Sequence, residues 1–67
     1  MRLKVNGEAY DTSQEDITGL LNELKIVPER VAVEVNLKII KRTDFGNCRL
    51  QEGDRIEIVY FVGGGMQ

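Results

Sequence analysis

Three consecutive glycines, Gly63 to Gly65, follow a strand-like run near the C-terminus and are the residues best suited to chemistry. Glycine has no Cβ, so a glycine backbone can enter a channel that is too narrow for other residues. A glycine carboxyl at the end of such a segment can be adenylated, and sulfur or a thiol can then attack the acyl-adenylate. Fraying is the competing interpretation, because terminal residues are often poorly ordered.

The other reactive groups of the sequence do not form a catalytic or metal-binding pattern. The chain has no histidine, which removes the usual general base at neutral pH, and its one cysteine, Cys48, cannot form a zinc cluster or an internal disulfide. A lone cysteine in so small a domain is more often an apolar filler. The glycine run lacks the lysine and the helix that a phosphate-binding loop requires. We therefore expect a protein that is not an enzyme and that binds no metal or cofactor itself.

The size and charge of the chain limit its class. With 67 residues and 42% apolar content, we expect one small folded domain over residues 1–62 and a flexible glycine-rich tail over residues 63–67. A net charge of −2 fits phosphate backbones poorly, so no nucleic-acid partner is expected. The sequence shows no signal-peptide core and no apolar run that approaches a membrane-spanning length. A cytoplasmic protein without a membrane partner is expected.

Alternating apolar and polar residues predict a β-hairpin at the start of the chain. Met1 to Asn6 has the period-2 pattern of a half-buried strand, and Asn6-Gly7 favours a two-residue turn. Glu8 to Tyr10 is expected to be the returning strand.

A helix is predicted after this hairpin. Its apolar residues recur at i, i+3, i+4 and i+7 and are Ile17, Leu20, Leu21 and Leu24. Thr12 with Glu15, and Ser13 with Asp16, have the spacing of capping boxes, and Pro28 is expected to end the helix. Gly19 either allows a close approach to the sheet or weakens the helix without purpose.

The second half of the chain predicts two further strands. Val31 to Asn36 alternates with its three valines on one face, and Leu37 to Ile40 is interpreted as a short continuation after a bend at Asn36. Turns are expected at residues 43–47 and 52–54, with Phe45 and Leu50 as inward anchors. Arg55 to Val62 is the last predicted strand, with Ile56 and Ile58 facing inward.

This order of elements predicts the fold class. A helix that crosses over between strands lets the first and last strands pair side by side in a mixed sheet. We expect an α+β roll, with a mixed sheet of about four to five strands and one main helix packed on one face.

The chain resembles a known family, the sulfur-carrier proteins of bacterial thiamin thiazole synthesis (ThiS). The resemblance covers nearly the whole chain, including the Asn6-Gly7 hairpin, and is strongest in residues 31–36, 50–59 and 61–65. A Gly-Asp turn, an Ile-x-Ile strand and a glycine terminus in register make the combination specific.

The resemblance implies a β-grasp (ubiquitin-like) fold and a role as a protein co-substrate. An E1-like (ThiF-like) enzyme would use ATP to adenylate the terminal glycine, and a cysteine desulfurase would supply the sulfur of a thiocarboxylate. Thiazole synthase (ThiG-like) would then receive the sulfur. Gly64 and Gly65 match the terminal pair of the family, so Gly65 would carry the thiocarboxylate, with Gly63 in the same tail.

Apolar residues beside the tail are candidates for partner docking. Val59, Phe61 and Val62 are interpreted in this way, because exposed apolar side chains next to a reactive terminus suit an interface. The alternative for Val59 and Val62 is an ordinary place in the sheet core.

One departure from the family pattern is that Met66 and Gln67 follow Gly65. A processing protease is therefore expected to remove Met66-Gln67 before activation; an inactive carrier is the alternative. Three other functions stay open. They are a sulfur carrier for molybdopterin, cysteine or methionine synthesis, a ubiquitin-like modifier of lysines, and a plain interaction module.

Overall fold

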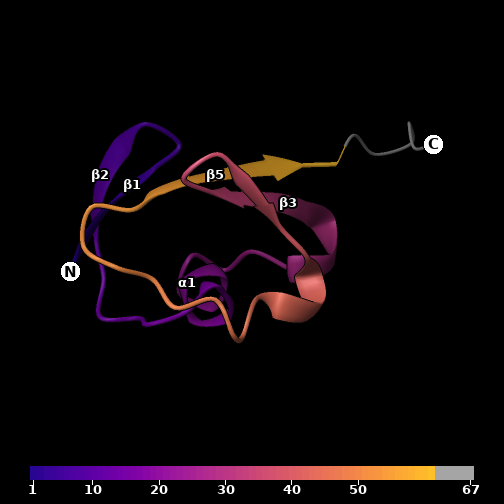
Figure 1. Ribbon diagram of the computed structural model, residues 1–67. Coiled ribbons are helices and arrows are strands. Elements are labelled where there is room, and N and C mark those ends of the chain that lie inside the picture. The colour runs from indigo at the N-terminus through magenta and orange to yellow at the C-terminus, as the bar shows by residue number, and fades with distance from the viewer. Residues whose placement is uncertain (62–67) are drawn as a thin grey trace.

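The computed structural model describes residues 1–61, so the predictions on Val62 and on the Gly63–Gln67 tail lie outside the described residues. Five strands lie in this part of the chain (Figure 1): β1 (Arg2–Val5), β2 (Glu8–Asp11), β3 (Val31–Val35), β4 (Lys38–Ile40) and β5 (Arg55–Tyr60). The helices are α1 (Ile17–Glu23) and the short 3-10 helices η1 (Pro28–Arg30) and η2 (Arg42–Asp44).

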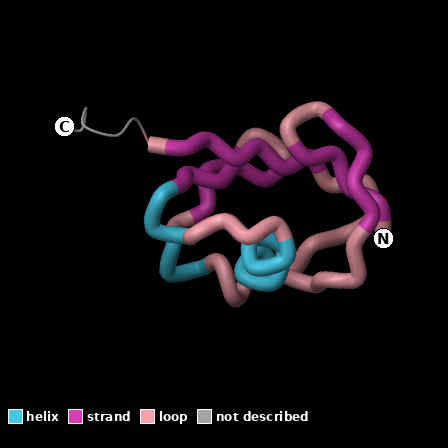
Figure 2. The backbone as a smooth tube through the Cα atoms, turned by 180° about the vertical axis from the view of Figure 1, so that it is seen from behind, coloured by secondary structure: helices cyan, strands magenta, loops and turns pink. Residues whose placement is uncertain are grey.

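The strands form one mixed sheet in the order β2-β1-β5-β3-β4. The first and last strands are parallel neighbours, with Lys4 opposite Arg55 and Val5 opposite Ile56, while the other neighbours are antiparallel. All helices of the described residues lie on one side of the sheet, as Figure 2 shows. The predicted α+β roll is confirmed, and β5 occupies the centre of the sheet.

The core lies between the sheet and this helical layer. The valines of β3 and the isoleucines of β5 alternate inward as predicted, and the apolar stripe of α1 faces them. Phe45 and Leu50 are buried as predicted. The buried apolar side chains are Leu3, Ile17, Leu20, Leu21, Val31, Val33, Val35, Phe45, Leu50, Ile56 and Ile58.

Both predicted ends of the helix are wrong in detail. Asp16 is the N-cap of α1, because its Oδ1 accepts a hydrogen bond of 2.8 Å from the Gly19 amide. Thr12 instead accepts from the Gln14 amide and donates to Glu23, so neither predicted capping box forms at the helix. A Cβ on Gly19 would meet the side chains of Gln14 and Asp16, so this glycine does not serve an approach to the sheet.

The C-terminal end of α1 comes well before Pro28. Lys25 adopts a positive φ of 62°, and the amides of Lys25 and Ile26 donate to the carbonyls of Asn22 and Leu21. These two bonds form a Schellman motif, which ends the helix without a proline. Among residues 1–61, no helix has the length and apolar character needed to cross a membrane.

The β3–β4 connection also differs from the prediction. Asn36 and Leu37 form a two-residue turn with φ of 52° and 72°, and β4 returns antiparallel to β3. Leu37 to Ile40 is therefore not a continuation of β3. The hairpin was missed because leucine occupies a position that normally favours glycine.

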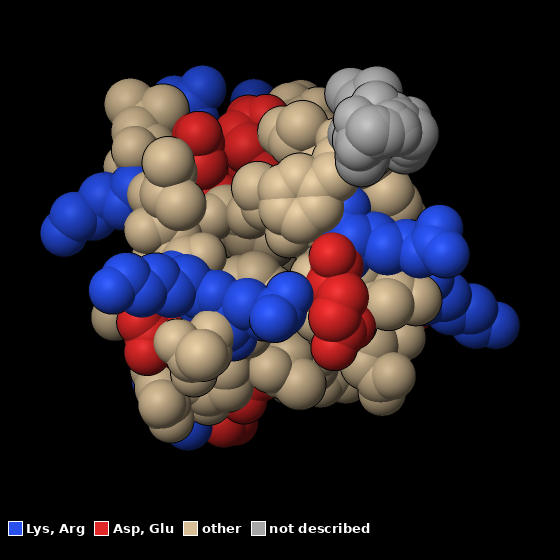
Figure 3. Space-filling model, turned by 90° about the vertical axis from the view of Figure 1, so that its right-hand side faces the viewer, with Lys and Arg blue, Asp and Glu red and all other residues tan. Residues whose placement is uncertain are grey.

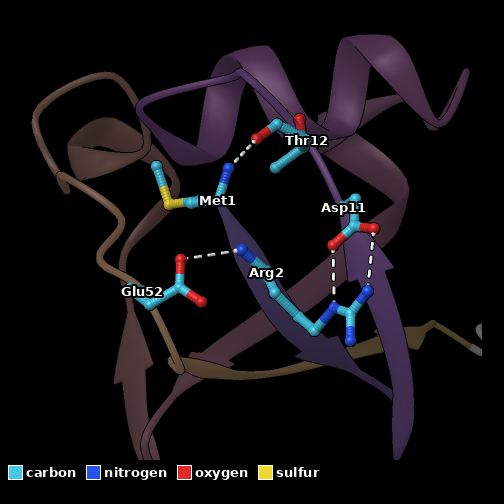
Figure 4. Close-up of polar contacts among 5 residues, drawn as sticks. All are labelled: Met1, Arg2, Asp11, Thr12 and Glu52. Carbon is cyan, nitrogen blue, oxygen red and sulfur yellow. Dashed lines mark hydrogen bonds and ion pairs between the residues drawn. The ribbon is translucent and has the colours of Figure 1, made fainter.

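Polar contacts fasten β1 to its neighbours, as Figure 4 shows. The terminal ammonium of Met1 donates to the Thr12 carbonyl at 2.7 Å, and the Arg2 amide donates to Glu52 at 3.0 Å. The Arg2 side chain pairs with Asp11 across the hairpin at 2.9 Å. This ion pair raises the pKa of Arg2 and lowers that of Asp11. Because both side chains are exposed, we assign the pair a positioning role.

Candidate functional site

The last residues of β5 expose an unusual amount of apolar surface. Val59, Tyr60 and Phe61 are 59%, 56% and 58% exposed, although each has a large apolar side chain. Val59 alternates with the buried Ile56 and Ile58 and so faces away from the helical layer, opposite Ala32 of β3. Val59 is therefore not part of the core. Val59 and Phe61 were predicted from the sequence as docking residues.

Tyr60 is a member of this surface that sequence reasoning missed. It continues the inward alternation of Ile56 and Ile58, so the pattern alone assigns it to the core. At this end of the sheet the core cluster does not include it, and the side chain is exposed. We refer to Val59, Tyr60 and Phe61 together as the β5-end surface.

The backbone holds the β5-end surface in a fixed place. β5 pairs with β3 along five residues, from Ile56 opposite Val35 to Tyr60 opposite Val31. The Phe61 amide then donates to the Arg30 carbonyl at 2.9 Å, so the direction of the chain is set up to residue 61. Figure 3 views this end of the molecule, where Lys and Arg side chains project around the uncharged surface and acidic groups lie between them. The central strand β5 therefore fixes the position of the chain up to Phe61, shortly before the glycine segment begins in the sequence.

Like charges lie side by side on the face of the sheet that the helices leave open. Glu57 of β5 pairs directly with Glu34 of β3. This pair lies two residues along the strands from the Val59–Ala32 pair, on the same face of the sheet. Neighbouring carboxylates repel each other and cost some stability in a free sheet. A cationic group on a partner would relieve this repulsion.

Cys48 lies in a separate, open depression of about 310 Å³. Burial raises the pKa of its thiol, and the nearby Asp54 and Asp44 carboxylates raise it further. A higher thiol pKa leaves less thiolate at neutral pH, and the thiolate is the reactive form. Within residues 1–61, no group of three His, Cys, Asp or Glu side chains is placed to hold a metal ion. The depression is lined by Ile39, Ile40, Lys41, Asp44, Asn47 and Cys48.

We expect Cys48 to react slowly with iodoacetamide at pH 7, more slowly than glutathione. The rate should rise with pH, because the raised pKa delays formation of the thiolate to higher pH. Mass spectrometry of timed samples at pH 7 and pH 9 measures both rates. Alkylation of Cys48 faster than that of glutathione at pH 7 would indicate an activated thiolate and contradict this assignment.

Comparison with known proteins agrees with this geometry. Residues 3–65 match the ThiS family. The chain belongs to the ThiS family. A crystal structure of the thiamine biosynthesis protein ThiS from Geobacter metallireducens has a TM-score of 0.84 and 36% identity, over 97% of this chain and 100% of that one. The fold is therefore the β-grasp fold of ThiS.

Relatives of this ThiS-family chain include longer proteins. Thiazole synthases from Magnetococcus marinus and Paramagnetospirillum magneticum are 42% and 39% identical over 97% of the chain. The chain spans only 20% of the length of each of these two relatives. The uncharacterized protein ycf40 from Pyropia yezoensis is 38% identical, over 94% of this chain and 90% of that protein.

Proposed function

We propose that this chain is a sulfur carrier protein of thiamin (thiazole) biosynthesis and acts as a protein co-substrate. In this proposal an E1-like enzyme adenylates the Gly65 carboxyl, sulfur converts it to a thiocarboxylate, and thiazole synthase receives the sulfur. A cysteine desulfurase supplies the sulfur as a persulfide, a thiol reduces this persulfide to release sulfide and is itself oxidised to a disulfide, and ATP is consumed by the activating enzyme.

The observation that carries this proposal is the position of the β5-end surface. The β5-end surface directly precedes Val62 and the glycines in the sequence. An enzyme that binds the reactive end would therefore also contact the exposed apolar side chains of Val59, Tyr60 and Phe61. From Phe61 to Gly65, an extended backbone reaches about 14 Å. With so short a reach, the folded part of the chain must dock against the enzyme. Membership of the ThiS family and the names of the two thiazole synthase relatives support the choice of chemistry and acceptor.

The chemistry requires little from the side chains of the carrier. In the activation step, a Gly65 carboxylate oxygen attacks the α-phosphorus of ATP and pyrophosphate leaves. Sulfide then attacks the acyl carbon, AMP leaves, and a thiocarboxylate remains. Glycines 63 to 65 would serve by fitting a narrow channel, because no Cβ widens the backbone. We propose that hydrolysis of the Gly65–Met66 peptide bond precedes these steps, because that bond occupies the carboxyl.

The proposal is tested by loading the carrier in vitro. A chain that ends at Gly65 is incubated with ATP, sulfide and the ThiF-like enzyme of the same organism, and its intact mass is measured. We expect a mass increase equal to the replacement of one oxygen by sulfur, and we expect the loaded chain to support thiazole formation by the synthase. Omission of ATP is the control. The proposal would be refuted if this chain showed no mass change with an activating enzyme that is active on another ThiS-family carrier.

A ubiquitin-like modifier is the second candidate, and the residues Met66 and Gln67 favour it. A terminus that must be exposed by proteolysis is typical of precursors whose glycine forms an isopeptide bond with lysine. Slower gel species that contain this chain and resist reductant would support a modifier. A sulfur carrier for molybdopterin, cysteine or methionine synthesis would differ from the proposed carrier only in the acceptor of the sulfur. The assay of thiazole formation distinguishes these carriers, because only a thiazole carrier would support that reaction.

A further inference from the structure

Two hairpins of the sheet use the same turn but differ at its second residue. Asn6 and Gly7 connect β1 and β2 with φ of 51° and 85°. Asn36 and Leu37 connect β3 and β4 with φ of 52° and 72°. The second position of this turn favours glycine, because an L side chain at positive φ brings its Cβ too close to the following carbonyl oxygen. Leu37 therefore keeps its side chain at an energetic cost that Gly7 avoids.

Leu37 gains no packing inside the molecule in return. Its side chain is 87% exposed, and Ile39 on the same hairpin is 76% exposed. A strained backbone that supports no internal contact is a reason to look for an external one. Leucine and isoleucine together offer an apolar tip of the kind that enters a pocket on another protein.

The turn is held rigidly by side-chain hydrogen bonds. The Asn36 Oδ1 accepts from the Arg55 amide at 3.0 Å, and its Nδ2 donates to Asp54 Oδ1 at 3.0 Å. The Asn36 amide also donates to the Arg55 carbonyl at 2.8 Å. These bonds join the turn to the first residue of β5. They restrict the turn to one conformation, in which the Leu37 side chain is exposed. Such preorganisation lowers the entropy lost on binding.

Charged side chains of both signs lie around this tip. Arg55 bonds through its amide to Asn36, and Lys38 follows Leu37 in sequence, whereas Glu34 of β3 lies directly opposite Ile39. Within residues 1–61, none of these three charged side chains forms an ion pair, since the ion pairs found there are Arg2–Asp11 and Arg49–Glu15. Asp54 is the carboxylate at the turn, and its oxygens already accept from Asn36 and from the Gln51 amide. The tip therefore fits an apolar pocket whose rim offers an acidic group to Arg55 and a cationic group to Glu34.

We propose that the β3–β4 turn is a second docking site, in which Leu37 and Ile39 enter an apolar pocket of the acceptor synthase whose rim carries charged groups of both signs. The site lies at the opposite end of the sheet from the β5-end surface, as Figure 1 shows for the start and end of β5. Six residue steps separate Arg55 from Phe61, five of them within β5, and they span about 20 Å. Two contacts this far apart fix the orientation of the carrier.

The choice of the synthase rests on the proposed function and on the relatives. The two named thiazole synthases contain a segment similar to this chain within one longer polypeptide, so a carrier-like segment and that activity occur together. The contact at Leu37 adds affinity that the short glycine segment cannot provide by itself.

The test compares two substitutions of the same residue in the full chain. Leu37→Asn removes the apolar side chain and tolerates positive φ, whereas Leu37→Met keeps an apolar side chain of similar volume. Binding to the purified thiazole synthase of the same organism is measured by calorimetry. We expect Leu37→Asn to weaken binding by about tenfold or more and Leu37→Met to change it little. Thermal unfolding should show that Leu37→Asn is no less stable than the unsubstituted chain.

Further outcomes decide the proposal. Arg55→Gln should weaken binding and reduce its dependence on salt, because the charge pair between Arg55 and an acidic group of the rim is lost. Equal affinity of the Asn and Met variants, or no binding of the unsubstituted chain, would overturn the proposal. Self-association in sedimentation that Leu37→Asn abolishes would also overturn it, in favour of a contact between two copies of this chain. Loading of Gly65 is measured separately, so failure to load would count against the proposed function and leave the binding result intact.

Discussion

A chain that ends at Gly65 is expected to accept sulfur, and a chain that continues to Gln67 is expected to accept none. The reason is chemical: in the longer chain the Gly65 acyl carbon belongs to a peptide bond and offers no carboxylate to ATP. The carboxylate of Gln67 lies two residues further along, and its side chain would have to enter a channel suited to glycine. The effect should therefore be close to all-or-none in intact-mass measurements with the activating enzyme.

Chains of intermediate length sharpen this prediction. A chain that ends at Gly64 has a free glycine carboxyl but loses about 3.5 Å of reach, so we expect slower loading than for the Gly65 end. A chain that ends at Met66, compared with the same chain carrying Met66→Gly, separates the effect of the side chain from the effect of length. Binding of every chain to the activating enzyme should be similar, because all retain the β5-end surface. Efficient loading of the chain that ends in Gln67, without cleavage, would contradict both the prediction and the assignment of Gly65.

The fold was predictable because the apolar periodicities are strong and consistent. The alternation of Val31, Val33 and Val35, and that of Ile56 and Ile58, leaves one face of each strand for burial. The apolar stripe of α1 can then pack only against that face of the sheet. A crossover helix between the first and last strands then favours their parallel pairing, which β1 and β5 show.

The local predictions were wrong where a residue adopts a backbone conformation that sequence rules assign to a different residue type. Leu37 and Lys25 both have positive φ, where glycine is the expected residue, so a hairpin and a helix end were missed. Asp16 caps α1 although the Thr12 and Ser13 spacings fit capping boxes. The sequence patterns do not show these conformations, because each pattern reports the usual residue of a position and not the backbone bonds that form there.

The candidate site was predictable in part. Val59 and Phe61 were proposed as docking residues because they lie beside the tail, while a core position stayed open for Val59; the structure places Val59 outside the core. Tyr60 was missed, because its exposure depends on where the core ends, not on which face the residue occupies. The identity of the acceptor is a property of another surface and is not contained in this chain.

Asn6→Ala is expected to be among the most destabilising substitutions outside the core. The Asn6 Oδ1 accepts a hydrogen bond of 2.7 Å from the Ile58 amide, and the Asn6 amide donates to the Ile56 carbonyl. The Asn6 side chain thus continues the β1–β5 ladder beyond the point where β1 turns away. Ile58 is only 7% exposed, so its amide would be left without an acceptor at a cost of about 1–3 kcal/mol.

Backbone strain adds to this loss. Asn6 has φ of 51°, a conformation that asparagine tolerates and that costs alanine about 1–2 kcal/mol. The sum, about 2–5 kcal/mol, is a large part of the roughly 3–10 kcal/mol expected for the whole domain from the usual stability per residue. Urea unfolding at 25 °C measures the change. Asn6→Gly removes the acceptor without the strain, and Asn6→Asp keeps an acceptor, so both should cost less than Asn6→Ala.

Asn36→Ala is the matched control, because Asn36 has φ of 52° and its Oδ1 accepts from the amide of an exposed β5 residue, Arg55. Water can replace that acceptor, so the loss at Asn36 should be limited largely to the strain. Equal costs at the two asparagines would mean that water also reaches the Ile58 amide. If Asn6 costs more, loading of Gly65 should fall as well, because Ile58 immediately precedes the β5-end surface. The β1–β2 turn then supports the part of β5 that leads into the docking surface.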